Sequence, residues 1–541
     1  MTYEEVIKIK KQLKHSWRYF FRKFGKLLSV QVKAIPLILN KQNVILMSPT
    51  ASGKTEAVMA PIAEKIYTEN PKPPCTLYIC PTHALVYDLY ERLNPILTDM
   101  EITLATRTGE RRQFSEKKPQ EVILTTPESM DSMLCRNTDL LDHIKFVVLD
   151  ELHLLHGNYR GDQLKLDLRR LEQISDDIQY SALSATFNDP EYIASQYFDE
   201  TRVIVAGDAR SIKYHLFSYE DYVELIQILK WCRRNKYRKI LFFCNSRALT
   251  EIIASKIKEA GVWPSHKVFA HHGSLSRTER DAAEKALKRE KAVICVATMT
   301  LEVGIDIGDI DIIGLVSPPP SVSSLLQRIG RGNRREDITR AIGIYSNDKE
   351  KEEFKLFFHK AELGEIEQLD KGPCLSVGVQ QVFSYLYQRK FEGLYEEDLV
   401  SLLIQLPMKR DQAEFLIDKL RNDEYIVVHR NKLFPSRKLL DLGDKGFIHS
   451  NIPGGFELQV VDESSGKSIG NIERVESLNK DFMLSGKKWT VMGVDTDKVR
   501  VAPSDEKYAD PAIFPGVKLH GRYYNFLPEK LKTICCKQVL I

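Results

Sequence analysis

Three features are missing from this sequence of 541 residues, and each absence excludes a class of protein. The nine cysteines form no CxxC pair, so the zinc ribbons and zinc fingers that use this spacing are not expected. No apolar run reaches the roughly 18 residues that a membrane-spanning helix needs, and no signal peptide is recognisable. We therefore expect a cytoplasmic protein with reduced cysteines and no membrane partner.

A large excess of charge of one sign is also lacking. Lys and Arg together number 78 and Asp and Glu 74, so the formal net charge is only +4. This balance excludes proteins that hold nucleic acid by bulk positive charge, and any basic contact must be local. The composition, with 43% hydrophobic and 28% charged residues, is that of a globular protein. At roughly 150 residues per domain, the length predicts three or four domains.

Short apolar runs alternate with helical stretches as far as Tyr345. Runs that are apolar throughout and separated by amphipathic helices indicate parallel sheets covered on both faces. The expected strands are residues 44–47, 76–80, 122–125 and 146–149, and then 240–243, 268–270, 292–296, 312–316 and 342–345. The series is interrupted after Val205, where a hinge is expected around 206–216. The sequence thus predicts two doubly wound α/β domains in tandem.

The pattern changes after Gly372-Pro373. Residues 376–421 are expected to form helices and residues 425–434 a tight hairpin, which together are typical of a winged helix. From residue 445 onward, short apolar runs with glycine turns predict a small β module with Trp489 in its core. The expected order is a basic amphipathic helix at 1–27, α/β domains at 28–208 and 209–366, a winged-helix-like module at 367–441 and a small β-rich module at 442–541.

The strongest local pattern is Ser48-Pro-Thr-Ala-Ser-Gly-Lys-Thr55, which lies between an expected strand and an expected helix. It matches the phosphate-loop pattern G-x-x-x-x-G-K-[ST], with Ser48 in place of the first glycine. Backbone N–H groups and a helix N-terminus would bind phosphates, Lys54 would reach the β and γ phosphates, and Thr55 would contact Mg²⁺. The expected cofactors are ATP and Mg²⁺. The expected nucleotide contacts are Thr50, Ala51, Ser52, Gly53, Lys54, Thr55 and Glu56.

The strand at 146–149 ends in Asp150-Glu151-Leu152-His153. An Asp at the carboxyl end of a buried parallel strand lies where such sheets bind ligands, so Asp150 is expected to hold Mg²⁺. Glu151 is expected to orient and activate the attacking water. Without the phosphate loop upstream, two surface carboxylates at a helix end would be the preferred interpretation.

The second domain contains the basic segment Gln327-Arg-Ile-Gly-Arg-Gly-Asn-Arg-Arg335. In isolation it would be interpreted as a solvated turn. Beside a nucleotide site, arginines from a second domain can stabilise the charge of a phosphoryl-transfer transition state. Arg331 and Arg334 are the best candidates for this role.

In this order, the motifs resemble those of a superfamily 2 DEAD/DEAH-type helicase over residues 24–346. Gln31 is similar to the adenine-reading Q motif, and Ser184-Ala185-Thr186 to the coupling motif. Further segments that resemble helicase motifs are 81–85, 107–110, 126–129, 241–247, 271–277 and 298–306. Residues 272–277, 300–306, 450–453 and 482–495 are most similar to the large helicase-related (Lhr) group, in a short version.

The resemblance implies an α/β fold of two tandem RecA-like domains that close on ATP and Mg²⁺, followed by a winged-helix module and a small β-rich module. It implies catalytic roles for Lys54, Glu151, Arg331 and Arg334, and adds Gln31, Gly304, Asp306, Arg331 and Arg334 to the nucleotide contacts. The implied coupling residues are His153, Ser184, Thr186 and Gln327. The implied strand contacts are Pro81, Thr82, His83, Thr108, Gly109, Thr126, Pro127, Asn245, Ser246, Arg247, His272, Gly273, Thr298 and Thr300.

The favoured prediction is an ATP-hydrolysing helicase or translocase that moves 3′-to-5′ on DNA, with single-stranded or tailed duplex nucleic acid as its partner. RNA or an RNA–DNA hybrid remains an alternative substrate. A different alternative is a nucleotide-gated, nucleic-acid-binding subunit of a repair or defence complex, without productive unwinding. The winged helix is expected to serve as a structural brace or as a reader of duplex.

Overall fold

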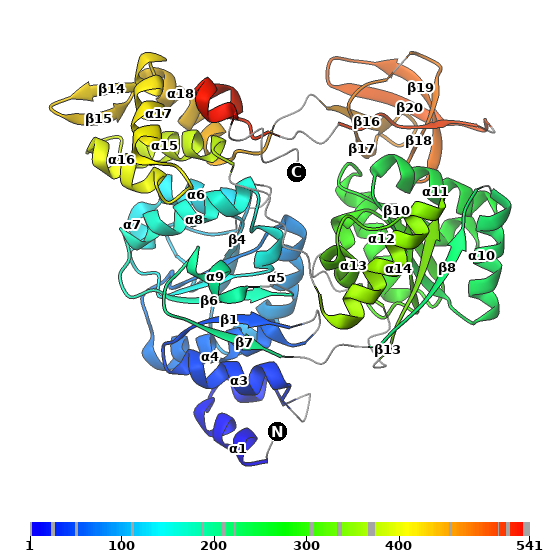
Figure 1. The fold of residues 1–541 in the computed structure, drawn as a ribbon, viewed down its shortest axis with the longest axis horizontal. Coiled ribbons are helices and arrows are strands. Elements are labelled where there is room, and N and C mark those ends of the chain that lie inside the picture. The colour runs from blue at the N-terminus through cyan, green and yellow to red at the C-terminus, as the bar shows by residue number, and fades with distance from the viewer. Residues whose placement is uncertain are drawn as a thin grey trace. The chain divides into compact units, whose positions relative to one another are not determined.

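The computed structural model forms two compact units, which are described separately (Figure 1). Unit 1 contains residues 1–207, 368–454 and 518–541, and unit 2 contains residues 208–367 and 455–517. The structure describes residues 3–22, 27–48, 52–109, 113–185, 189–206, 211–220, 222–302, 307–332, 338–365, 374–453, 457–475, 477–506, 508–515 and 520–533. Within these residues no helix is long and apolar enough to cross a membrane.

Unit 1 is built on a parallel sheet with the strand order β3-β4-β2-β5-β6-β1-β7. The strands are β1 (Asn43–Met47), β2 (Thr76–Ile79), β3 (Leu104–Arg107), β4 (Val122–Thr125), β5 (Phe146–Leu149), β6 (Gln179–Ser184) and β7 (Thr201–Val205). Helix α3 (Ser29–Leu39) precedes β1, and the helices that connect the strands are α4 (Lys54–Glu69), α5 (His83–Thr98), α6 (Pro127–Arg136), α7 (Thr138–Leu141), α8 (Tyr159–Glu172) and α9 (Pro190–Ser195). The strands expected at 44–47, 76–80, 122–125 and 146–149 are confirmed.

The basic N-terminal stretch forms two helices, α1 (Tyr3–Gln12) and α2 (Trp17–Phe20), where one was expected. The backbone N–H groups of His15 and Ser16 donate to the carboxylate of Glu64 in α4, at 3.0 and 2.7 Å. Glu64 is buried, so these bonds anchor the chain between α1 and α2 on the helix that follows the phosphate loop.

Helices and a hairpin from the later part of the chain also belong to unit 1. They are α15 (Ser376–Gln388), α16 (Glu396–Leu403), α17 (Arg410–Asn422), β14 (Ile426–His429), β15 (Lys432–Pro435), α18 (Arg437–Asp444) and the 3₁₀ turns η4 (Phe447–His449) and η5 (Tyr524–Phe526). The expected hairpin is confirmed, and both residues of its turn, Arg430 and Asn431, have positive φ angles of 48° and 60°. We call residues 374–453 and 520–533 the helical module.

The helical module extends beyond the boundaries that the sequence predicted. Tyr523, Leu527 and Leu531 are buried in the same apolar cluster as Phe383 of α15. These three residues fall within 442–541, the range expected to be β-rich. The structure divides that range, because the apolar side chains after residue 520 complete the core of the helices.

Unit 2 is built on a second parallel sheet, with the order β10-β11-β9-β12-β13-β8. Its elements are β8 (Ser211–Ser218), α10 (Tyr222–Arg234), β9 (Lys239–Cys244), α11 (Arg247–Glu259), β10 (Val268–His271), α12 (Arg277–Arg289), β11 (Val293–Ala297), η3 (Met299–Leu301), β12 (Ile312–Val316), α13 (Val322–Ile329), β13 (Ile338–Tyr345) and α14 (Asp348–Leu363). The hinge expected around 206–216 is wrong from Ser211 onward, because these residues pair with β13 along the sheet edge.

Unit 2 also contains a mixed sheet, with the order β17-β16-β20-β19-β18-β21. Its strands are β16 (Leu458–Asp462), β17 (Ser468–Ile472), β18 (Asp481–Leu484), β19 (Lys487–Val494), β20 (Lys498–Pro503) and β21 (Asp510–Pro511). We call residues 457–515 the β module. Trp489 lies in its core, as expected, and donates its indole N–H to the Leu484 carbonyl at 2.9 Å.

Candidate functional site

The phosphate loop lies between β1 and α4, and Gly53 is its last residue before the helix. Gly53 has a φ of 78°, a conformation that favours glycine, and an added Cβ would lie 2.4 Å from Nε2 of Gln31. Gln31 donates from this nitrogen to the Gly53 carbonyl at 3.3 Å. The residue expected to read adenine therefore contacts the phosphate loop directly. Thr50 and Ala51 lie outside the described residues.

Lys54 begins α4 and is almost completely buried. Its ammonium group donates to the Ser48 carbonyl at 2.6 Å, across the loop. Thr55 and Glu56 complete the first turn, where Glu56 forms an ion pair with Arg92 at 3.2 Å. A buried cation at a helix N-terminus is well suited to bind an anion such as a phosphate.

Asp150 lies at the carboxyl end of β5 and is 5% exposed. Its carboxylate accepts the Glu151 backbone N–H at 2.9 Å and the Tyr78 hydroxyl at 3.1 Å. Burial and the neighbouring Glu151 carboxylate raise the pKa of Asp150 to about 7, against the opposing effect of Lys54. A cation near this carboxylate would favour its ionised form.

Glu151 has a left-handed backbone, with φ 44° and ψ 47°. This conformation costs a residue with a Cβ about 1–2 kcal/mol. The side chain is 7% exposed, and its Oε2 lies 3.5 Å from Nδ1 of His153. Backbone strain of this kind is concentrated at functional sites, which agrees with the catalytic role expected for Glu151.

His153 connects this segment to the end of β6. Its Nδ1 accepts the Ala185 backbone N–H at 3.3 Å and lies 3.3 Å from the Ser184 hydroxyl. The structure therefore brings together two of the predicted coupling residues, His153 and Ser184, while Thr186 lies outside the described residues. A displacement of Ser184 or Ala185 would therefore displace the His153 ring, which contacts Glu151.

The strand contacts expected in unit 1 differ in exposure. Thr82 and His83 are half-buried and Gly109 is exposed at the surface. Thr82 caps α5 by accepting the Leu85 N–H at 3.2 Å. Thr108 and Thr126 are only 2% and 1% exposed. Pro81 and Pro127 are also buried.

The sequence did not single out Arg160, which holds two of these segments together. Its guanidinium forms a two-pronged ion pair with Glu128, at 2.5 and 2.9 Å, and donates to the Pro81 carbonyl. Arg160 lies in an ordinary amphipathic helix, so no local pattern marked it. The pairing fixes the loop after β2 relative to the start of α6.

Among the residues of unit 2 that were expected to contact a nucleic-acid strand, some are exposed and some are hydrogen-bonded within the protein. Asn245 and Ser246 are exposed. The Asn245 amide accepts from Arg328 at 2.9 Å and donates to the Pro318 carbonyl at 2.7 Å, which fixes its orientation. Arg247 donates to the Ser274 hydroxyl at 2.8 Å.

His272 has a different environment from the one expected. Its side chain is 0% exposed and lies 2.8 Å from the Glu251 carboxylate through Nε2. Any contact of this segment with a strand would be made by its backbone or by the exposed Gly273. Thr298 is 8% exposed, and Thr300 lies 2.9 Å from Nδ1 of His271.

The arginine segment is tied to the residues around Glu302. Arg331 is 1% exposed and donates to the Glu302 carbonyl at 2.6 Å, while Arg328 pairs with the Glu302 carboxylate at 2.6 Å. Gln327 donates to the Ser323 hydroxyl at 3.3 Å. The expected site residues Gly304, Asp306 and Arg334 lie outside the described residues.

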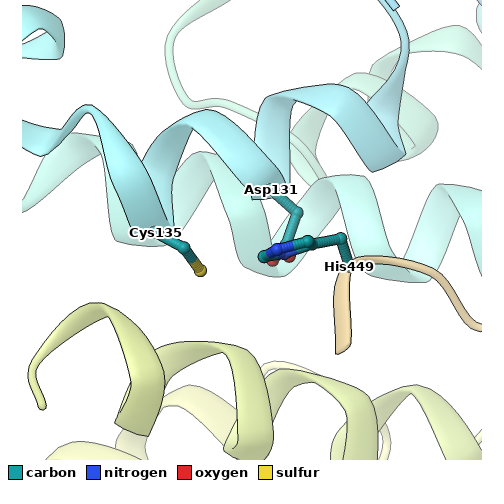
Figure 2. Close-up of side chains that lie close together, drawn as sticks. All are labelled: Asp131, Cys135 and His449. Carbon is teal, nitrogen blue, oxygen red and sulfur yellow. The ribbon is translucent and has the colours of Figure 1, made fainter. Parts of the chain in front are cut away.

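A second cluster of titratable groups lies where the helical module meets the first sheet's helices (Figure 2). Asp131 and Cys135 come from α6 and His449 from η4, and their potential ligand atoms lie within 4.8 Å of one another. Asp131 also pairs with Arg170 of α8 at 2.7 Å and accepts from Ser384 of α15 at 2.6 Å.

This cluster is better described as a buried ion-pair network than as a metal site. Burial alone would lower the pKa of His449, but its hydrogen bonds to Asp131 and Cys135 raise it to about 9. The protonated ring offers no lone pair to a metal. The Arg170 guanidinium, 3.5 Å from the Cys135 sulfur, would also repel a metal cation.

Comparisons with known proteins identify the family of the chain. The DEAD/DEAH box helicase model matches residues 28–193, and the helicase conserved C-terminal domain model matches residues 220–336. The chain is 31% identical to the ATP-dependent helicase Lhr-Core of Methanocaldococcus jannaschii, over 94% of this chain and 66% of that relative. The chain belongs to the Lhr group of superfamily 2 helicases. This helicase spans just under two thirds of the relative's length.

Solved structures of helicases share its architecture. The Mycobacterium smegmatis helicase Lhr bound to ssDNA and AMP-PNP matches with a TM-score of 0.70 and 25% identity, over 82% of this chain and 62% of that chain. The DUF1998 helicase MrfA bound to DNA matches with a TM-score of 0.73 and 21% identity, over 92% and 73% of the chains. The prediction of two RecA-like domains with a further β-rich module is confirmed.

Proposed function

We propose that this helicase hydrolyses ATP and that nucleic acid stimulates the hydrolysis. The observation that carries the proposal is a chain of close contacts from the phosphate-loop side to the end of β6. The Glu151 N–H donates to Asp150, the Glu151 carboxylate lies 3.5 Å from His153, and His153 lies 3.3 Å from the Ser184 hydroxyl. Lys54 is close enough to Asp150 to lower its pKa, so the phosphate loop and the end of β5 form one site.

Each group in the first lobe has a chemical role in this proposal. The first turn of α4 and Lys54 bind the phosphates of ATP, because both present positive charge to one point. Glu151 accepts the proton of the water that attacks the γ phosphate. Gln31 holds Gly53 in its left-handed conformation through its hydrogen bond to the Gly53 carbonyl. Binding of adenine by Gln31 would therefore affect the conformation of the phosphate loop.

The described residues also fit a Mg²⁺ ion. Thr55 and Asp150 would hold it, since hydroxyl and carboxylate oxygens are its preferred protein ligands. Burial and the neighbouring Glu151 carboxylate raise the pKa of Asp150, so a bound cation would stabilise its ionised form. When bound, Mg²⁺ would neutralise charge on the phosphates.

Arg331 and Arg334 are proposed as the arginines that stabilise the transition state. Arginines in such positions raise hydrolysis rates by roughly 10³–10⁵-fold. The bonds of Arg328 and Arg331 to Glu302 support this role, because they pre-order the guanidinium groups of the segment. Gly304 and Asp306 are proposed to line the nucleotide from the same lobe.

The proposed substrate is a single strand or a tailed duplex, with DNA favoured and 3′-to-5′ movement. The relative from Mycobacterium smegmatis was solved with ssDNA, which supports DNA. Strands are tracked without sequence preference through contacts to the nucleic-acid backbone. The half-buried Thr82 and the exposed Asn245, Ser246 and Gly273 offer hydroxyl, amide and N–H groups for such contacts. The buried Thr108 and Thr126 would contribute through their backbones.

The helical module is proposed to be a winged helix that acts as a brace. Its first helix, α15, is bonded to α6 and α8 through the buried Asp131 and Arg170. A module held in this way fixes the geometry of the first lobe. Binding of duplex by its hairpin remains the second possibility.

The test is the ATPase rate with single-stranded DNA, single-stranded RNA and duplexes with 3′ or 5′ tails. We expect single-stranded DNA to stimulate hydrolysis by at least about tenfold and unwinding to require a 3′ tail. Stronger stimulation by RNA would assign the motor to RNA. Stimulation by none of them would overturn the proposal and favour a nucleotide-gated binding subunit.

A further inference from the structure

A fully buried carboxylate lies at the contact between the β module and the second lobe. Glu251 of α11 is 0% exposed, and its two oxygens accept the backbone N–H groups of Ser485 and Gly486, at 2.8 and 2.5 Å. The same carboxylate lies 2.8 Å from Nε2 of His272. Three donors from two distant segments therefore converge on Glu251.

The turn that binds Glu251 is shaped for this contact. Ser485 and Gly486 connect β18 to β19 and have φ angles of 61° and 60°. Two successive left-handed residues are typical of the tightest hairpin turns, and they direct adjacent N–H groups toward one anion. An added Cβ at Gly486 would lie 3.2 Å from Cβ of Ala254, so the turn lies directly against α11.

Lys258, two turns further along α11, binds the opposite side of the same turn. Its ammonium group donates to the carbonyls of Gly486 and Ser485, at 2.6 and 3.3 Å. The Ser485 hydroxyl also donates to Glu279 of α12 at 2.5 Å. The N–H groups of the turn thus donate to a carboxylate, and the carbonyls of the turn accept from a cation. This pairing of both kinds of backbone group makes the attachment specific.

The segment after His272 is bonded to the β module through its backbone. The Ser276 N–H donates to the Ile469 carbonyl at 2.8 Å, and the Asn471 N–H donates to the Ser274 carbonyl at 2.7 Å. Leu275 thereby forms an antiparallel bridge with Gly470 of β17. Residues 272–276 are held on one side by β17 and on the other by Glu251.

We propose that Glu251 is a positioning residue that orders the strand-binding segment 272–274 through the β module. The inference deepens the proposed function and rests on it, since the segment matters only if a strand binds there. Glu251 does not touch the strand. It holds His272 inward, which leaves Gly273 at the surface with open space around its Cα. Arg247 is ordered by the same segment, because it donates to Ser274.

The first test is Glu251→Gln, which replaces one acceptor oxygen by an amide that faces two backbone donors. We expect the concentration of single-stranded DNA that gives half-maximal ATPase stimulation to rise about tenfold, with the maximal rate within about twofold of the wild type. Glu463→Gln is the matched control, because Glu463 is an exposed carboxylate of the β module and pairs only with the exposed Arg500 in the described contacts. Its half-saturating concentration should stay unchanged.

Hydrogen exchange tests the same inference without relying on activity. In Glu251→Gln the amides of residues 272–276 should exchange faster, while those of β12 and β13 in the same unit keep their wild-type protection. His272→Gln, whose amide can replace Nε2 as a donor, should behave like the wild type, and His272→Leu like Glu251→Gln.

Unchanged protection of residues 272–276, or a lower maximal rate at an unchanged half-saturating concentration, would overturn the positioning role. If no nucleic acid stimulates the wild-type enzyme, the proposed function fails, and exchange still decides whether Glu251 orders the segment. A variant whose second unit unfolds would lose protection in β12 and β13 too, and comparison of His272→Gln with His272→Leu would then decide between the outcomes.

Discussion

At the scale of single residues, Glu151 combines three unusual properties. Its backbone is left-handed, its side chain is nearly buried, and it neighbours a second carboxylate whose pKa is raised to about 7. None of these helps the protein to fold, since each costs free energy. Their coincidence beside the phosphate loop supports Glu151 as the general base.

We expect Glu151→Gln to lower the turnover number of the ATPase by about 10²–10⁴-fold. The amide keeps the size of the side chain but cannot accept the proton of water. Binding of a non-hydrolysable ATP analogue should stay within a few-fold of the wild type, because the phosphates are held by Lys54 and α4. Single-turnover kinetics and equilibrium titration measure the two quantities.

Glu69→Gln is the control for this experiment, since Glu69 ends α4 as an exposed carboxylate. It should change neither quantity. Near-normal turnover in Glu151→Gln would show that another group activates the water.

His272 shows why the sequence could locate the sites but not every contact. The sequence identified the motif around it correctly as a segment of the second lobe. Side-chain direction, however, is decided by Glu251 and by the Ser485–Gly486 turn, which lies more than 200 residues away in the chain. No local pattern contains that information. By contrast, Lys54 and Asp150 follow directly from a loop and a strand end, so their positions were predictable.

At the scale of helices and strands, apolar composition decided which elements could be predicted. β1, β2, β4 and β5 are apolar runs and were expected. β3 and β6 were missed because they carry polar residues whose partners lie elsewhere. Gln179, for example, donates to the carbonyls of Ile38 and Gln42, and Thr106 donates to Gln113.

The contact between α6, α8 and α15 depends on a few buried charges. Arg170 is 0% exposed and pairs with Asp131, which His449 also contacts at 2.8 Å. Removing one partner of such a buried pair costs about 3–5 kcal/mol, because the other charge is left without compensation. The contact between the helical module and the first lobe is therefore sensitive to protonation.

The pKa of His449 is raised to about 9 in the folded protein, from an unperturbed value of 6.5. A raised pKa of a base contributes stability that is complete below the unfolded value and is lost as the pH rises through the folded value. We expect the free energy of unfolding to fall between pH 6.5 and 9.5, by up to about 3 kcal/mol from this group. Urea unfolding at both pH values measures the change.

His449→Gln should remove most of this pH dependence, while Asp131 and Cys135, the titratable groups that interact with His449, are unchanged. His429→Gln is the matched control, because His429 is an exposed histidine of the hairpin. This variant should keep the pH dependence of the wild type. If the free energy of unfolding changes equally with pH in His449→Gln and the wild type, the effect belongs to another group.

At the scale of the whole molecule, each RecA-like lobe carries one appended module. The helical module belongs to the unit of the first lobe and the β module to the unit of the second. Buried hydrogen bonds hold each module to its own lobe, so we expect the chain to move as two bodies during the ATPase cycle.

Fluorescence energy transfer between introduced labels tests this expectation. Label pairs at Thr98 and Asp418, within unit 1, and at Lys236 and Asp497, within unit 2, should give constant distances. A pair at Thr98 and Lys236 should change when a non-hydrolysable ATP analogue and a strand bind. A change within either unit would show that a module moves on its lobe.

The division of the chain has a consequence for how the protein is made. The backbone passes from one unit to the other at residues 207/208, 367/368, 454/455 and 517/518. Tyr523, Leu527 and Leu531 complete the core around Phe383, so that core stays open on the ribosome until these residues have emerged. Unit 2, whose last segment ends at residue 517, can close earlier. Although the first lobe is synthesised first, the unit to which it belongs is the last to be finished.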